Sequence, residues 1–437
     1  MSSGLFPTTN VRFYTLGCKV NQYETQAIRE AMEKKGACDI EGQKGVRCDL
    51  VVLNTCTVTE DSDRTNRYWI RRLRREHPAA RIVVTGCYAE RNRKEIESMA
   101  EVDAVFPNED KAVLAERLLG GTVSVAPAPG SFLPLSVSRS EGHTRAYVKI
   151  QDGCNHVCSF CKVTLVRGSS RSRALSEIRE EVLRLRDAGY REIILTGIQL
   201  GAYGLDFRFA GSTIRLRDVI ESCAEVDGIE RVRLGSIEIT DVGAPIVAAF
   251  REIPKFCPHL HIPLQSGDNE VLRRMNRSYT REFYLETIRR LQAQVPDFAL
   301  SLDVMAGFPG ETEEQFENSV ELLRSVRPLK THVFPYSRRE GTRAADWPCL
   351  PPAVVKDRVR KLIVLAERIA EEVRGSYFGR TLRILGEEKE KDAEFSNGRA
   401  ANYLKVFFKY PRPAQGCIIT LRLEKLYQDG VFGTAVD

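Results

Sequence analysis

Three cysteines crowded into eight residues constrain this chain more than any other feature of its sequence. Cys154, Cys158 and Cys161 form a C-x3-C-x2-C run directly after a predicted strand at residues 146–150. Thiolates this close together in a loop can bind one soft metal centre. A closed zinc site needs a fourth ligand, for which His156 is the local candidate, awkwardly placed inside the loop. Three ligands on a four-iron cluster leave one iron open to a further ligand, so the run favours an iron–sulfur site.

Short apolar runs alternate with polar, helix-like stretches along most of the chain. This alternation predicts an α/β fold in which parallel strands are joined by crossover helices. We expect an open parallel α/β sheet in an N-terminal domain at residues 10–125, followed by a Pro-, Ser- and Gly-rich linker at 126–143. The predicted strands of this first sheet are Val11–Leu16, Asp49–Leu53, Arg81–Thr85 and Val102–Phe106.

The alternation resumes after the linker and repeats more often. It predicts strands at residues 146–150, 192–196, 231–234, 259–262, 300–305 and 331–335, separated by helices that include 176–188, 281–294 and 313–326. Such units build a partial or complete β/α barrel, here at residues 144–373 with a last helix near 353–373. Short strands and frequent turns from 374 to 437 predict a small all-β barrel.

A second set of cysteines is spread along the first domain. Cys18, Cys56 and Cys87 each come just past the carboxyl end of a predicted strand. The carboxyl ends of parallel strands meet at one edge of a sheet, where ligands bind. A buried structural thiol is the alternative for any one of them. Three cysteines at matching positions instead favour a second metal site with three ligands, and the remaining six, which share no spacing, are expected to be ordinary thiols.

Composition and charge indicate where the protein is located and what kind of partner it binds. No apolar stretch approaches the roughly 18 residues that span a bilayer, and no signal peptide is visible, so we expect a cytoplasmic protein without a membrane partner, and a monomer. Residues 64–75 hold six arginines and no acid, and residues 154–173 also lack acids. Such stretches are either solvated surfaces or contacts to an acidic partner.

Several motifs occur in order along the chain. They are Thr15-Leu-Gly-Cys-Lys-Val-Asn-Gln-Tyr-Glu24, Asn54–Thr59, Thr85–Glu90, Ile194–Gln199, His261–Gly267, Asp303–Thr312 and His332–Ser337. Together with the Cys154 run they resemble the methylthiotransferases of the radical S-adenosylmethionine (SAM) superfamily over nearly the whole chain. The C-terminal segment resembles the family's RNA-binding TRAM domain. The chain departs from the family pattern at Lys162–Val166 and at Ile239–Thr240.

The resemblance implies two four-iron clusters and two uses of SAM. Cys154, Cys158 and Cys161 would hold the cluster at which SAM is cleaved to a 5′-deoxyadenosyl radical. Cys18, Cys56 and Cys87 would hold the cluster whose bound sulfur a second SAM methylates. Residues assigned by resemblance to the SAM pocket are Phe160, against the adenine, and Gly197, Gln199, Ser236, Glu238, Gln265 and Asp303. Turn or capping roles are the alternative for these strand-end residues.

The substrate assignment follows from the first motif. Its Gly17–Glu24 stretch resembles the branch that adds a methylthio group to C2 of N6-threonylcarbamoyladenosine at position 37, beside the anticodon. The expected partners are a tRNA anticodon arm, an electron donor and a sulfur source. The phosphates of the tRNA are expected to contact Arg167, Arg171 and Arg173. The alternatives are isopentenyladenosine in tRNA, a ribosomal protein or, in a different class, a zinc-stabilised RNA-binding protein without catalysis.

Overall fold

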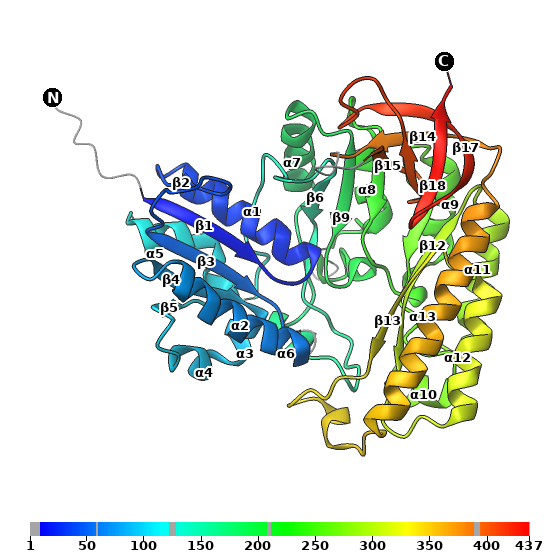
Figure 1. Cartoon of the computed structure of the whole chain (residues 1–437), viewed down its shortest axis with the longest axis horizontal. Coiled ribbons are helices and arrows are strands. Elements are labelled where there is room, and N and C mark those ends of the chain that lie inside the picture. The colour runs from blue at the N-terminus through cyan, green and yellow to red at the C-terminus, as the bar shows by residue number, and fades with distance from the viewer. Residues whose placement is uncertain are drawn as a thin grey trace.

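The computed structural model describes residues 9–57, 60–121, 128, 130–207, 211–388 and 394–436. Its strands form three main assemblies in chain order: a parallel N-terminal sheet, two three-stranded parallel sheets side by side, and a small closed barrel. Figure 1 shows them in blue, in green to yellow, and in orange to red. This confirms the predicted α/β fold with an all-β module at its C-terminal end.

The N-terminal sheet is covered on both faces. Its parallel strands have the order β2-β1-β3-β4-β5, with β1 at Asn10–Thr15, β2 at Cys38–Asp39, β3 at Leu50–Thr55, β4 at Arg81–Gly86 and β5 at Ala104–Val105. Leu50 and Val52 share a core cluster with residues of α1 (Lys19–Glu33) and α5 (Leu114–Leu119), and Val51 and Leu53 share one with α2 (Glu60–Glu76). A strand covered on both faces is apolar throughout, which explains its unbroken apolar run.

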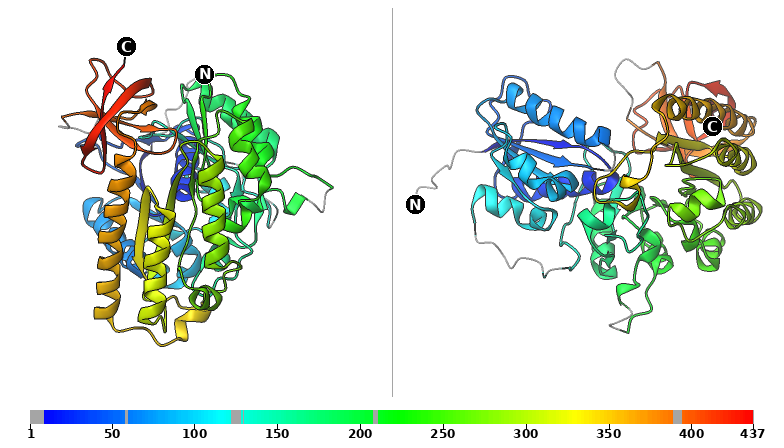
Figure 2. Two further views of the ribbon diagram at one scale, coloured as in Figure 1. Left: turned by 90° about the vertical axis from the view of Figure 1, so that its right-hand side faces the viewer. Right: turned by 90° about the horizontal axis from the view of Figure 1, so that it is seen from below.

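The central strands form a partial barrel. The order is β6-β9-β10 in one sheet and β11-β12-β13 in the other, all parallel, with bridges Val232↔Phe256 and Ser236↔His261 joining the two sheets. The strands are β6 (Ala146–Lys149), β9 (Glu192–Thr196), β10 (Arg231–Leu234), β11 (His259–His261), β12 (Ala299–Ala306) and β13 (Lys330–Pro335). Figure 2 shows helices covering the outside: α7 (Leu175–Asp187), α8 (Leu216–Ala224), α9 (Ala244–Glu252), α11 (Arg281–Gln294), α12 (Glu313–Val326) and α13 (Pro352–Gly375).

Local sequence signals set where several of these helices begin. Thr312 caps α12, and its side chain and that of Gln315 form a reciprocal capping box. Thr280 accepts the Phe283 amide at the start of α11. The remaining short elements are α3 (Cys87–Arg91), α4 (Arg93–Glu97), α6 (Val163–Arg167), α10 (Asn269–Arg274), β7 (Gln151–Asp152), β8 (Arg171–Ser172) and the 3-10 helices η1 (Asn108–Val113), η2 (Leu200–Ala202), η4 (Ile239–Asp241) and η5 (Arg343–Asp346).

The C-terminal module is a closed five-stranded barrel. Its order is β14-β15-β16-β18-β17, and β14 pairs with β17 to close it. The strands are β14 (Thr381–Gly386), β15 (Ser396–Ala400), β16 (Lys405–Phe408), β17 (Ile418–Tyr427) and β18 (Gly430–Ala435). Ile419, Leu421 and Leu423 of β17 are buried and alternate with exposed residues, as a strand with one buried face requires.

This small barrel packs against the amino-terminal ends of the central strands. Arg231 donates to the carbonyl oxygens of Arg383 (2.6 Å) and Arg399 (2.8 Å). The ring of Tyr403, a residue at φ 74°, stacks on His259 with centroids 4.6 Å apart. Because these contacts satisfy buried polar groups of both modules, the C-terminal barrel is firmly attached to the partial barrel.

The predicted linker is also packed where it is described; residues 126, 127 and 129 lie outside the described part. Leu133, Leu135 and Val137 are buried in the core cluster of the partial barrel. Glu30 of α1 accepts the backbone amides of Ser138 (2.8 Å) and Arg139 (3.1 Å). The segment therefore fastens α1 to the partial barrel. No helix in the described ranges is long and apolar enough to cross a membrane.

Candidate active site

The three strand-end cysteines of the N-terminal sheet lie on touching loops. Gly17 and Gly86, which precede Cys18 and Cys87, have φ of 108° and 101°. A Cβ on Gly17 would lie 2.8 Å from the Cys56 sulfur, and one on Gly86 would lie 2.3 Å from a carbonyl oxygen of the Cys56 loop. Only glycine combines this backbone conformation with such a close approach. The loops thus place Cys18, Cys56 and Cys87 at one edge of the sheet.

Asn21, in the first turn of α1, ties these loops together. Its Nδ2 donates to the carbonyl oxygens of Leu16 (2.8 Å) and Thr55 (2.9 Å), so it joins the ends of β1 and β3. Its Oδ1 accepts from Arg167 Nη2 at 2.6 Å. The sequence motif contains Asn21, but nothing local in the sequence reveals this role.

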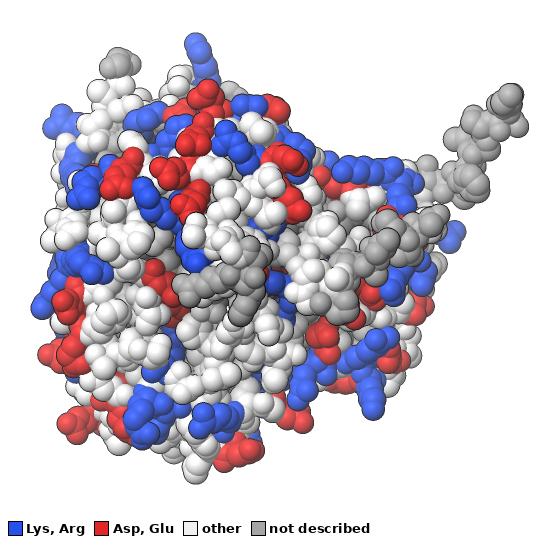
Figure 3. Space-filling view, turned by 180° about the vertical axis from the view of Figure 1, so that it is seen from behind, with Lys and Arg blue, Asp and Glu red and all other residues white. Residues whose placement is uncertain are grey.

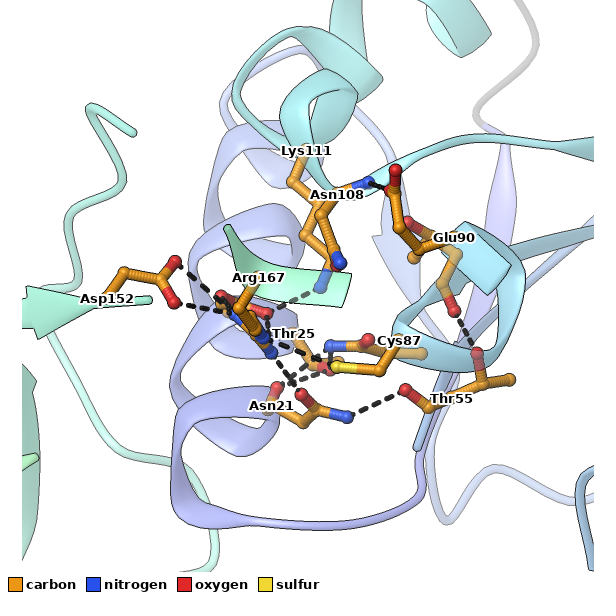
Figure 4. Close-up of polar contacts among 12 residues, drawn as sticks. Asn21, Thr25, Thr55, Cys87, Glu90, Asn108, Lys111, Asp152 and Arg167 are labelled. Carbon is orange, nitrogen blue, oxygen red and sulfur yellow. Dashed lines mark hydrogen bonds and ion pairs between the residues drawn. The ribbon is translucent and has the colours of Figure 1, made fainter. Parts of the chain in front are cut away.

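A buried charge network connects this edge to the partial barrel (Figure 4). The fully buried carboxylate of Glu24 on α1 accepts from Lys111 Nζ (2.5 Å), Lys149 Nζ (2.6 Å) and the Arg167 guanidinium. Lys149 also donates to Asp152, at 2.7 Å. Burial alone would raise the pKa of Glu24, but Arg167, Lys111 and Lys149 hold that pKa well below its usual range.

The charges of this network fit an anionic sulfur ligand. Lys111, Lys149 and Arg167 are buried and face the buried carboxylates of Glu24 and Asp152, and the partly buried Arg171 also pairs with Asp152, so cationic side chains outnumber carboxylates here. Arg167 directs its Nε at Cys87 Sγ, 3.3 Å away. A buried charge is costly unless it is paired, and a Cys87 thiolate supplies the missing negative charge. The surroundings of Cys87 therefore suit a thiolate-bound metal centre.

The same contacts correct the prediction that Arg167 and Arg173 bind RNA phosphates, whereas the same role for Arg171 stays a prediction. Arg167 and Arg173 are only 4% and 3% exposed, and Arg173 pairs with Glu181 at 3.1 Å. Arg171 donates to Asp152 Oδ2 at 3.3 Å. Buried cations require partners inside the protein, so Arg167 and Arg173 join modules of the chain rather than meet phosphates, whereas Arg171 is only partly buried.

The Cys154 run lies in the loop between β7 and α6. The amides of His156 and Val163 each donate to a sulfur at 3.4 Å, those of Cys154 and Cys161 respectively. Arg277, which the sequence analysis missed, donates from Nη1 to Cys158 Sγ at 3.3 Å. Burial raises the pKa of the Cys161 thiol to about 11, so a metal is needed to hold it as a thiolate near neutral pH.

In the part of the chain that the structure describes, the sulfurs of Cys154, Cys158 and Cys161 do not all lie within 4.8 Å of one another. A Zn–S bond of about 2.3 Å in a tetrahedron puts two sulfurs about 3.8 Å apart. Within the described ranges, the group of histidine, cysteine and acidic ligand atoms that all lie within 4.8 Å of one another is His261, Asp303 and His332, without a cysteine. The loop is therefore not arranged as a closed zinc site with His156 as a fourth ligand.

Most residues predicted for the SAM pocket follow the carboxyl ends of the central strands or belong to the Cys154 loop, but Asp303 lies inside β12 and not at its end. Gln199 Oε1 accepts from the Asn155 amide (3.3 Å) and the Cys154 thiol (3.4 Å). Gln265, at φ 63°, is 9% exposed, and its buried Oε1 has no hydrogen-bond partner. An orphaned buried acceptor suits a ligand with an N–H donor, such as the amino group of SAM.

The other predicted pocket residues have partners in the protein. Glu238 pairs with Arg277, and Asp303 lies 3.1 Å from His261. Ser236 forms the backbone bridge to His261. Phe160 packs edge to face on Phe308 within an apolar cluster, with centroids 6.4 Å apart. Gly197 lies against Gln151, whose Oε1 accepts the amide of Gln199 at 2.7 Å.

The two departures from the family pattern have distinct structural roles. Val163–Arg167 forms α6, which carries the network arginine. Ile239 is fully buried in the core of the partial barrel and begins η4. Asp241 ends η4, and burial raises its pKa to about 6.

The chain is similar to known proteins over almost its whole length. Residues 148–323 match the Radical SAM superfamily, and residues 10–107 match Uncharacterized protein family UPF0004. Threonylcarbamoyladenosine tRNA methylthiotransferase MtaB of Bacillus subtilis is 37% identical, covering 98% of this chain and 97% of its own. The MtaB of Thermotoga maritima is 34% identical with the same coverage. The tRNA-2-methylthio-N(6)-dimethylallyladenosine synthase of Acidothermus cellulolyticus is 36% identical, covering 93% and 84%.

A solved structure shares the fold. It is the radical S-adenosylmethionine methyltransferase TsrM from Kitasatospora setae, with cobalamin and a [4Fe-4S] cluster bound. Its TM-score is 0.56 at 15% identity, over 77% of each chain. The match to the Radical SAM superfamily implies that the chain uses one [4Fe-4S] cluster and SAM. With both sequence domains and full-length relatives in agreement, the chain belongs to the methylthiotransferase family of radical SAM enzymes.

Proposed function

We propose that this protein adds a methylthio group to C2 of N6-threonylcarbamoyladenosine at position 37 of tRNA. The observation that carries the proposal is the full-length similarity to relatives named for that reaction. Two separate groups of three cysteines, at facing edges of the N-terminal sheet and the partial barrel, support it. The reaction replaces the C2 hydrogen by a CH3S group: a sulfur source supplies the sulfur, one SAM supplies the methyl group, and a second SAM, cleaved with one electron from an electron donor, takes up the hydrogen atom.

The residues around each cysteine group have roles in this proposal. Cys154, Cys158 and Cys161 would hold the cluster that binds SAM, and Cys18, Cys56 and Cys87 would hold a second four-iron cluster. When bound, the first cluster supplies the electron that cleaves SAM, and the second carries the sulfur to be transferred. Hydrogen bonds from protein donors to cluster sulfurs tune the potential of such centres. Arg277 and Arg167 are placed to donate those bonds to Cys158 and Cys87.

The C-terminal barrel offers a surface suited to RNA. Phe395 packs against Tyr427 and Phe432 with centroids 5.1 Å apart in each pair, and Lys409 and Lys425 lie over the Phe395 and Phe432 rings. Aromatic rings beside cations stack bases and neutralise phosphates. Figure 3 shows basic and acidic side chains interspersed over the face seen from behind, so charge alone does not mark an RNA surface there. We infer that this aromatic face contacts the anticodon arm.

A second candidate substrate is N6-dimethylallyladenosine, which occurs in the name of the relative from Acidothermus cellulolyticus. The chemistry at C2 would be the same, and only the group on N6 would differ. That group is apolar, whereas the threonylcarbamoyl group carries a carboxylate and a hydroxyl. The two candidates therefore predict different pockets for the N6 substituent.

Nucleoside mass spectrometry of tRNA from cells lacking the gene tests the proposal. We expect 2-methylthio-N6-threonylcarbamoyladenosine to disappear and its precursor to accumulate. The wild-type gene should restore the product, and Cys56→Ala or Cys154→Ala should not. Loss of the methylthio group from dimethylallyladenosine would favour the second candidate, and unchanged levels of both nucleosides would refute methylthiolation of tRNA. Protein purified without air should hold about eight irons if both clusters are present, rather than stoichiometric zinc.

A further inference from the structure

Three polar side chains of the partial barrel lie close together: Asp303, which was predicted for the SAM pocket, and two histidines that have no role in the mechanism described above. His261, Asp303 and His332 come from the neighbouring strands β11, β12 and β13, and their ligand atoms all lie within 4.8 Å of one another. His261 Nε2 lies 3.1 Å from Asp303 Oδ2, and the two imidazole rings are 5.6 Å apart. Thr331 and Val333, the neighbours of His332, line a cavity against α13, so His332 points to the opposite, inner side of β13.

Two lysines add positive charge to this group. Lys19, the first residue of α1, acts electrostatically on His332 and on Tyr403, and Lys330 acts on His332. Within the described ranges, neither lysine has a carboxylate within 4.0 Å. The carboxylate of the group, Asp303, is shared with His261. The lysines that act electrostatically on His332 therefore have no carboxylate partner within ion-pair distance among the described residues.

This charge balance favours an anion over a metal ion. Two histidines and a carboxylate can bind a divalent cation. However, such a site gains its affinity from negative ligands, and the two lysines would repel the cation. A carboxylate, in contrast, would gain charge-assisted hydrogen bonds from a lysine and from a histidine N–H.

The group also lies where a substrate must sit. Lys19 directly follows Cys18, at the edge of the N-terminal sheet. Asp303 is linked to the predicted SAM pocket beside the Cys154 loop. The backbone amide of Gln265, a residue predicted for that pocket, donates to the carbonyl oxygen of Asp303 at 2.9 Å. Lys19 thus adjoins one cysteine site along the chain, and Asp303 is hydrogen-bonded to Gln265, which is predicted for the pocket of the other site.

We propose that Lys19 and His332, with the His261–Asp303 pair, bind the carboxylate and hydroxyl of the threonylcarbamoyl group. This inference rests on the proposed function and names the pocket that recognises its substrate. A site that hydrogen-bonds polar groups of its substrate discriminates against an analogue that lacks them, because the analogue makes none of those bonds. Dimethylallyladenosine lacks both groups, so this pocket selects against it.

Binding of short RNAs to the full-length protein with its clusters tests the pocket. The probes are anticodon stem-loops that carry N6-threonylcarbamoyladenosine, its methyl ester or N6-dimethylallyladenosine at position 37, followed by fluorescence anisotropy. The ester keeps the shape and removes the charge. We expect the wild type to bind the acid about 10- to 100-fold more tightly than the ester, the range of a charged hydrogen bond.

Lys19→Met should abolish the difference between acid and ester and leave affinity for the ester within about twofold of the wild type. His332→Gln should reduce the difference. Lys34→Met, which removes an exposed lysine at the other end of α1, is the matched control and should keep the difference. Because Lys19 adjoins Cys18, the iron content of each variant is measured, and a Lys19 variant that loses iron is replaced in the comparison by His332→Gln.

Three results would refute the proposal that these residues bind the threonylcarbamoyl group. The wild type could bind acid and ester equally, the variants could keep the preference for the acid, or the variants could weaken both RNAs equally. Stoichiometric binding of Zn2+ or Mn2+ that His332→Gln abolishes, with the preference for the acid unaffected, would assign the group to a cation instead. Failure of the proposed function is a separate observation: the wild-type enzyme would then add no methylthio group to the threonylcarbamoyl RNA in a product analysis by mass spectrometry.

Discussion

The buried carboxylate of Glu24 holds together parts of the chain that are far apart in sequence. It accepts from Lys111, Lys149 and Arg167, and only the first of these belongs to the N-terminal sheet domain. Glu24→Gln removes the charge and keeps the size of the side chain. Among the residues that the structure describes, Lys149, Arg167 and Arg171 then share the carboxylate of Asp152, and Lys111 loses its carboxylate partner, so the excess of cationic over acidic side chains grows.

Glu24→Gln should cause a large loss of stabilising free energy. Breaking a buried ion pair by removing one partner costs about 3–5 kcal/mol, because the other charge stays buried. Glu24 has three cationic partners, and an amide oxygen offers them only a neutral acceptor. We therefore expect a loss of at least about 3 kcal/mol in the free energy that holds α1 against the partial barrel.

Hydrogen–deuterium exchange of the protein without its clusters measures this loss. A loss of about 3 kcal/mol corresponds to roughly 100-fold faster exchange wherever the amides of α1 exchange by subglobal opening. Glu33→Gln on the same helix is the control. Its pair with Arg139 is partly exposed and worth at most about 1 kcal/mol. Equal protection of α1 in the two variants would refute the reasoning.

The pH dependence gives a further check. The pKa of Glu24 is lower in the folded protein than in the unfolded chain, so its charge stabilises the fold fully above the unfolded value of about 4.3. That stabilisation is lost as the pH falls through the lower folded pKa. The difference between wild type and Glu24→Gln should therefore be constant between pH 7 and pH 6 and shrink in strong acid. A difference that grows as the pH falls would contradict this assignment.

Three further predictions follow from the other contacts. Gly86→Ala should lower the melting temperature and the iron content, because its Cβ would lie 2.3 Å from a carbonyl oxygen at a φ of 101°; normal iron content would contradict the role of that loop. Arg277→Met should make the reduction potential of the Cys154-loop cluster more negative in an EPR-monitored titration, because it removes a donor to Cys158, and an unchanged potential would count against that bond. Lys409→Glu combined with Lys425→Glu should weaken tRNA binding about tenfold or more and reduce the slope of log K against log salt by about 2, whereas Arg324→Glu on α12 should not.

These point variants are a better test of RNA binding than deletion of residues 375–437. Ala299 and Leu329 of the partial barrel share a core cluster with the C-terminal barrel, and Arg231 donates to its backbone. Deletion would expose these apolar side chains and leave a buried arginine without its acceptors. Loss of tRNA binding after deletion could therefore reflect damage to the partial barrel.

Local periodicity in the sequence determined the strands and the positions of the six motif cysteines relative to them. A parallel strand covered on both faces must be a short apolar run, and the residues after its carboxyl end must lie at one edge of the sheet. Both statements depend only on neighbours along the chain. The predicted strand at 192–196 and the predicted helices at 281–294 and 313–326 accordingly coincide with β9, α11 and α12.

Only the tertiary structure decided what the charged residues do. Arg167 lies in an acid-free stretch, and this pattern predicted a contact with RNA. Its carboxylate partner Glu24, however, is 143 residues away in the sequence. The inward position of His332 can be read from alternation along its strand, but its proximity to Lys19 cannot. A charge carries no sign of its partner in its local sequence, and whether it is buried and paired or free to bind a ligand depends on contacts made only when distant segments pack together.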